Sequence, residues 1–136
     1  MNKINYLELI KTADVYSVAE VSPLDYAKLI SANLNNKIFL KREDLQTTFS
    51  FKIRGAVNKI KNLDENALKN GVVCSSAGNH AQGVALASKL NKNRAVIVMP
   101  QTTPSIKIEA VKALGAEIIL HGDNYDEAFS KAKEIE

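Results

Sequence analysis

Lys52 is the residue whose position most favours chemistry in this chain. It stands at the start of residues 52–60, where apolar side chains recur at the spacing of an amphipathic helix. Ser50, just before this helix, is expected to cap its first turn. The field at a helix N-terminus opposes a cation, so this position favours the neutral amine that can attack an aldehyde and form an imine. Position alone also allows an ordinary exposed lysine on the surface.

A second polar segment makes the chemical interpretation of Lys52 stronger. It reads Ser75-Ser76-Ala77-Gly78-Asn79-His80-Ala81-Gln82-Gly83, and it joins an apolar run, residues 71–74, to a helix-like run, residues 81–90. Backbone amides at a helix N-terminus bind carboxylates and phosphates, and ligands in open α/β sheets bind beyond the carboxyl ends of the strands. The alternative is an ordinary connection, in which Ser76 or Asn79 only caps the helix.

Strand-like and helix-like segments alternate along most of the chain. The expected strands are residues 37–40, 71–74, 95–98 and 117–120, and each is followed by a helical segment. Thr103-Pro104 predicts a helix start with proline at the first helical position, and Asp123 or Asn124 begins the last helix. This alternation predicts an α/β fold with an open, mostly parallel sheet flanked by helices. Residues 1–36 are expected to form an N-terminal helical segment, and residues 37–136 the α/β region.

Composition excludes several classes of function. The chain has 136 residues and a formal net charge of +3, without a basic run interleaved with aromatic residues, so we expect no nucleic-acid partner. No apolar run has membrane-spanning length, and no signal peptide is recognisable. Cys74 is the only cysteine and is expected to be a buried, inert thiol in a cytoplasmic protein. No Cys/His cluster has the spacing of a metal site, and neither GxGxxG nor GxxxxGK[ST] occurs.

Several segments, in the same order along the chain, resemble the threonine dehydratases (threonine ammonia-lyases), a family of fold-type II pyridoxal-phosphate enzymes. The resemblance runs from about Thr12 to the end. The matching segments are Lys41-Arg42-Glu43-Asp44, Ser50-Phe51-Lys52-Ile53-Arg54-Gly55-Ala56, Ser76-Ala77-Gly78-Asn79-His80-Ala81-Gln82-Gly83-Val84, Val98-Met99-Pro100 and residues 115–122. The resemblance implies that residues 37–136 form most of the smaller, cofactor-binding domain of such an enzyme.

The resemblance also implies roles for particular residues. Lys52 would bind pyridoxal 5′-phosphate through an imine, Phe51 would lie against the cofactor, and Asn79 would hydrogen-bond its ring hydroxyl. A loop for the substrate carboxylate would be formed by Ser76, Ala77, Gly78, Asn79 and His80. The implied reaction is the dehydration and deamination of L-threonine to 2-oxobutanoate and ammonia, at the entry to isoleucine synthesis. L-Serine is the other expected substrate.

The family holds the cofactor phosphate with a glycine-rich loop, and the pyridine nitrogen with a serine, both farther along the chain. This sequence has six glycines and no run of them. We therefore expect an N-terminal portion that is inactive alone, from a parent enzyme that forms a homo-oligomer. Two alternatives stay open, namely a serine dehydratase or serine racemase of the same family, and a non-catalytic remnant that binds a partner or an anion. His121 is expected to be a structural or surface residue.

Overall fold

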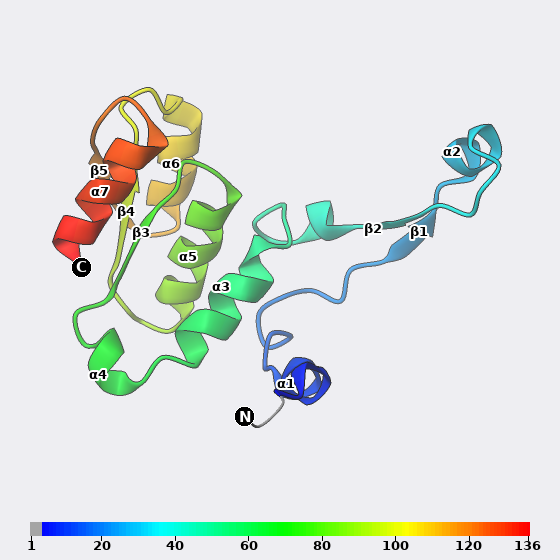
Figure 1. Cartoon of the computed structure of the whole chain (residues 1–136), viewed down its shortest axis with the longest axis horizontal. Helices are drawn as coiled ribbons and strands as arrows, with labels where there is room; N and C mark the ends of the chain where they lie inside the picture. The colour runs from blue at the N-terminus through cyan, green and yellow to red at the C-terminus, as the bar shows by residue number, and fades with distance from the viewer. Residues whose placement is uncertain (1–3) are drawn as a thin grey trace.

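A three-stranded parallel sheet is the centre of the fold in the computed structural model of this chain, which describes residues 4–136 (Figure 1). Its strands lie in the order β3 (Val72–Ser75), β4 (Ala95–Met99) and β5 (Glu117–Leu120). Val72 is opposite Ala95, and Val96 is opposite Glu117. All five residues of β4 are buried, as expected for a central parallel strand that is covered on both faces. The predicted α/β fold with a parallel sheet is confirmed.

Helices cover both faces of this sheet. On one face, α5 (Asn79–Leu90) and α6 (Ser105–Ala113) pack against Ala95, Ile97 and Met99. On the other face, α7 (Tyr125–Ile135) buries Ala128 and Ala132 against Val98. The alternation of side chains along β4 therefore separates the two cores.

Helix α3 (Lys52–Lys61) packs on α5 as an outer layer, and the short α4 (Glu65–Leu68) leads from α3 to β3 (Figure 1). The buried stripe of α3 consists of Ile53, Ala56, Val57 and Ile60, as the apolar spacing predicted. The sheet therefore positions α5, and α5 in turn positions α3.

The N-terminal part of the chain projects away from the sheet (Figure 1). It contains α1 (Tyr6–Thr12), β1 (Leu24–Tyr26), α2 (Lys28–Asn33), β2 (Phe39–Lys41) and the 3-10 helix η1 (Glu43–Leu45). The strand expected at residues 37–40 corresponds to β2, but it pairs antiparallel with β1 and is not part of the parallel sheet. The expectation of a helical segment at 1–36 missed β1, because three residues are too few to show a strand period. Residues 1–3 of that segment lie outside the described residues.

Two of the expected helix starts differ in detail. Pro104 is the N-cap of α6 and not its first helical residue. Ser50 does not cap α3, because Phe51 is the N-cap and the buried Ser50 hydroxyl has no hydrogen-bond partner among residues 4–136. The start of α7 is as predicted, since the Asn124 side chain accepts a hydrogen bond from the backbone nitrogen of Glu127 at 3.0 Å.

Candidate active site

Lys52 is the first residue of α3, and its side chain is exposed. Its Nζ lies 5.3 Å from the centroid of the Phe51 ring. The buried stripe of α3 faces α5, so the backbone at Lys52 is held while its amine stays accessible. An accessible primary amine beside an aromatic ring has the features required of a nucleophile that binds an aldehyde.

Helix α5 lies directly against the backbone of Lys52. A Cβ built on Gly83 would be 3.1 Å from the carbonyl oxygen of Lys52 and 3.2 Å from its carbonyl carbon. Such contacts are tighter than ordinary van der Waals packing, so only glycine allows this approach without a shift. Gly83 lies one turn after Asn79, and the N-terminal turns of α3 and α5 therefore meet here.

The turn before α5 is held by Ser76. Its Oγ accepts hydrogen bonds from the backbone nitrogens of Gly78 and Ala81, each at 3.3 Å. Gly78 is the N-cap residue of α5, and Ser76, two residues earlier, holds the turn through these side-chain hydrogen bonds. The backbone amides of Asn79 and His80 begin the helix and have no acceptor within the described part of the chain. They are therefore available to an anion at this N-terminus.

His80 connects the two helix starts electrostatically. Desolvation, and next the nearby ammonium of Lys52, lower the pKa of His80 from its ordinary value. The imidazole is therefore neutral at neutral pH. Lys52 of α3 is therefore near enough to His80 of α5 to influence the pKa of its imidazole.

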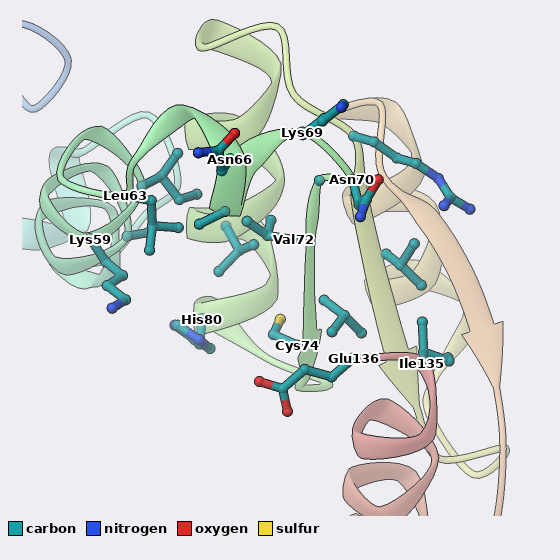
Figure 2. Close-up of a pocket in the computed structure, with 18 of the residues that line it drawn as sticks. Lys59, Leu63, Asn66, Lys69, Asn70, Val72, Cys74, His80, Ile135 and Glu136 are labelled. Carbon is teal, nitrogen blue, oxygen red and sulfur yellow. The ribbon is translucent and has the colours of Figure 1, made fainter.

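A cavity lies next to this region rather than at Lys52. It is an open trough of about 1080 Å³ along β3, lined also by α3, α4 and the end of α7. Figure 2 shows Cys74 and His80 among its lining residues. Lys52, Phe51, Asn79 and the turn 76–78 do not line it. Within residues 4–136, β3 has no strand on this side, so the trough follows an uncovered sheet edge.

Burial raises the pKa of Cys74 to about 11, which makes its thiol a poor nucleophile.

The sequence reasoning assigned no role to Glu43 and Arg54, although both lie in the matching motifs. The guanidinium of Arg54 donates from Nε to Oε2 and from Nη2 to Oε1 of Glu43, both at 2.8 Å. This pairing lowers the pKa of Glu43 to about 2. The sequence shows that Glu43 and Arg54 carry opposite charges in neighbouring motifs. Their separation along the chain does not show whether the two side chains are in contact.

The geometry agrees with the comparisons to known proteins. A family model for pyridoxal-phosphate dependent enzymes matches residues 17–136. The biosynthetic L-threonine dehydratase of Pasteurella multocida is 52% identical over 130 residues, which are 96% of this chain and 25% of that protein. Threonine deaminase isoform 2 of Solanum lycopersicum superposes with a TM-score of 0.91 at 51% identity, covering 96% of this chain and 36% of that one. Maize serine racemase superposes with a TM-score of 0.89 at 34% identity, covering 98% and 40%.

This chain belongs to the family of pyridoxal-phosphate dependent enzymes. Its resemblance to the threonine dehydratases is confirmed over most of its length. The chain spans about a quarter of the length of the curated relatives that it matches.

The residues at the two helix starts fit part of this cofactor. Lys52 offers an exposed amine, Phe51 an adjacent ring, and α5 two open amides for an anionic group. The six glycines include no run that could wrap a phosphate.

None of the described helices is long and apolar enough to cross a membrane. Over residues 4–136, no group of three or more His, Cys, Asp or Glu side chains could hold a metal ion.

Proposed function

We propose that this chain is the lysine-bearing part of a threonine dehydratase, which converts L-threonine to 2-oxobutanoate and ammonia. The observation that carries the proposal is the close approach of Gly83 to the backbone of Lys52, because it brings the first residue of α3, which bears the amine, to the N-terminal turns of α5. The names of relatives at about half identity support threonine as the substrate. Maize serine racemase has a similar fold but a lower sequence identity, so a serine racemase is the second candidate.

In this proposal, Lys52 holds pyridoxal phosphate covalently through Nζ, Phe51 lies against it, and the Asn79 side chain hydrogen-bonds its ring hydroxyl. The bound cofactor supplies an electron sink for the substrate's α-carbon. Lys52, once its amine is free, takes the α-proton of the substrate. The backbone amides of Asn79 and His80 donate to the substrate carboxylate, and Ser76 fixes the shape of the turn, together with Ala77 and Gly78.

The position in metabolism is part of the proposal. The word "biosynthetic" in the names of several relatives supports a place at the start of isoleucine synthesis. L-Serine is the alternative substrate, and the parent protein is expected to be a homo-oligomer in the cytoplasm. The phosphate of the cofactor needs donors beyond those described, so the 136 residues are expected to be inactive alone.

The first test is reductive labelling. The purified chain is mixed with pyridoxal phosphate and reduced with borohydride, and the modified lysine is mapped by mass spectrometry. We expect selective modification of Lys52, and none at that site in the K52R variant. Labelling scattered over surface lysines, or none, would show that these residues do not form the cofactor site on their own.

The second test concerns the reaction. This chain replaces the matching region of the Pasteurella multocida relative, and 2-oxobutanoate and D-serine are measured with L-threonine and L-serine as substrates. We expect 2-oxobutanoate from the chimera and none from its K52A variant, whereas K59A, two turns along the same helix, should stay active. D-Serine as the main product would favour the racemase. No product from a folded chimera would support the non-catalytic remnant.

A further inference from the structure

The ion pair between Arg54 and Glu43 is a well-defined charged contact that the proposed chemistry does not use. Its two hydrogen bonds form a bidentate fork, both at 2.8 Å. The Arg54 and Glu43 side chains are only 23% and 16% exposed. A bidentate pair of this kind restricts orientation as well as distance.

The same pair gathers three parts of the chain. Arg54 Nη2 also donates to the carbonyl oxygen of Glu20 at 3.1 Å, and the guanidinium lies 5.1 Å from the centroid of the Tyr16 ring. Glu43 accepts a hydrogen bond from the Ser22 hydroxyl. The segment 16–22, the 3-10 helix η1 and the first turn of α3 are therefore joined at one point.

Arg54 lies in the first turn of α3, two residues after Lys52. Two residues correspond to about 200° around a helix axis, so the two side chains leave opposite sides of the helix. Through Arg54, Glu43 therefore binds the side of α3 that is opposite the Lys52 side chain. A restraint on that side sets the rotation of the first turn, and hence the direction of the amine.

The loop between Glu43 and Lys52 is restrained both within the loop and at its ends. Phe49 has a φ of 53°, in the left-handed region that residues with a side chain seldom adopt. The buried hydroxyls of Thr48 and Ser50 have no hydrogen-bond partner in the described chain. The buried Gln46 side chain ties the loop to the Glu20 backbone, accepting from its nitrogen at 2.9 Å and donating to its oxygen at 2.8 Å, and the Glu43–Arg54 pair joins the two ends of the loop.

We propose that the Arg54–Glu43 ion pair positions Lys52, by fixing the rotation of the first turn of α3 so that the amine faces the N-terminus of α5. The importance of that direction rests on the proposed function. The Gly83 contact fixes how closely the helices approach, and the ion pair fixes how α3 is turned. Arg54 and Glu43 are positioning residues and contact neither cofactor nor substrate.

A second ion pair provides a matched control. Lys61, the last residue of α3, donates to Asp14 of the N-terminal segment. It links the same two parts of the chain at the far end of the helix, nine residues from Lys52. The K61Q variant therefore removes a comparable link without touching the first turn.

The test compares R54K, E43Q and K61Q with the unmodified chain in two measurements. The first is backbone hydrogen exchange of residues 46–54 without cofactor. The second is the ratio of Lys52 to Lys59 modification by pyridoxal phosphate and borohydride, in which Lys59 serves as an internal reference. We expect R54K and E43Q to speed exchange in 46–54, and to lower the ratio, by about fivefold or more. K61Q should leave both unchanged.

Unchanged exchange in R54K and E43Q would overturn the proposal, and so would an equal effect of K61Q. The exchange measurement needs no cofactor, so it tests the restraint on the first turn of α3 separately from the proposed function, and an unchanged labelling ratio in R54K and E43Q would overturn the positioning of Lys52. If Lys52 is not labelled selectively but exchange still responds to R54K and E43Q, the result would count against the proposed function. It would not count against the restraint on the first turn of α3. Circular dichroism of each variant confirms that it is folded.

Discussion

Gly83 on α5 lies against the main chain of Lys52 on α3, with room for a hydrogen atom but not for a methyl group. Because of this contact, the size of residue 83 determines how close the backbone of Lys52, which bears the exposed amine, lies to α5. Neighbouring small residues in α5 extend the same close packing, since Ala81, Ala85 and Ala87 are also buried. The approach of the two helices is therefore a property of the sequence of α5, and it can be tested without any ligand.

G83A should destabilise the chain. The added Cβ would meet backbone atoms at 3.1 and 3.2 Å and the Cβ of Ala56 at 3.4 Å, so α3 and α5 must shift apart by a few tenths of an ångström. We expect a loss of roughly 1–3 kcal/mol in the free energy of unfolding, as for other overpacked cores, measured by urea denaturation. Lys52 labelling should fall as well, because the two helix starts separate.

G55A in α3 is the matched control. A Cβ at Gly55 would meet nothing within 4 Å, and the residue is exposed in the middle of the helix. Glycine costs about 0.5–1 kcal/mol relative to alanine at such a position, so G55A should stabilise the chain by a similar amount. Equal effects of G83A and G55A would show that the helix contact does not limit the size of residue 83.

S76A should weaken the start of α5. The hydroxyl accepts from two backbone nitrogens, and its removal leaves both without this partner. Loss of a capping side chain typically costs about 1 kcal/mol, which urea denaturation can measure. S105A is a suitable comparison, because Ser105 begins α6 but makes no side-chain cap among the described residues, and this variant should be close to neutral. A neutral S76A would exclude a stabilising role of this hydroxyl in the turn.

The parallel sheet was predictable because its signals are local. Buried strands such as β4 are short apolar runs, and Asn124 announces α7 by a capping pattern that depends on neighbouring residues only. The antiparallel pairing of β1 with β2 was not predictable in this way. Its strands have three residues each, all exposed, so neither burial nor alternation marks them in the sequence.

The candidate site was predictable in part for the same reason. Lys52 and the turn 76–80 were found because each begins a helix, and a helix start has a recognisable sequence pattern. The contact of Gly83 with Lys52 and the pairing of Glu43 with Arg54 depend on how separate elements pack. A single sequence contains no measure of such distances. The missing cap at Ser50 has a similar cause, since the tertiary structure turned its hydroxyl into the interior.

Cys74 should react slowly with thiol reagents in the folded chain. Burial raises its pKa from 9.0 to about 11, so the thiolate fraction at pH 8 is about 100-fold lower than for an ordinary cysteine. We expect iodoacetamide to modify Cys74 at a correspondingly low rate at pH 8, and at an ordinary rate in urea. Fast modification of the folded chain would show that the trough along β3 exposes a reactive thiol.

The stability of the chain should depend on pH through Glu43. The Arg54 guanidinium lowers the pKa of this carboxyl from 4.5 to about 2 in the folded chain. Between these values the unfolded chain binds the proton more strongly, so the free energy of unfolding rises with pH from about 2 to about 4.5. The contribution is fully present above that range and is lost as the pH falls through it. The difference in pKa sets an upper limit of about 3 kcal/mol, and the partial exposure of the pair reduces the expectation to about 1 kcal/mol.

The E43Q variant isolates the contribution of Glu43 to the pH dependence of stability. Such a variant is needed because other carboxylates with lowered pKa values also contribute at acidic pH, among them Asp14, Asp44 and Glu117. Urea denaturation of both proteins between pH 3 and pH 7 should show a flatter profile for E43Q, with most of the difference below pH 5. E117Q removes the exposed partner of Arg94 and should change the slope much less, since solvent screens that pair. Parallel profiles for the unmodified chain and E43Q would mean that the Glu43 carboxylate has the same proton affinity folded and unfolded. The ion pair with Arg54 would then not hold the first turn of α3.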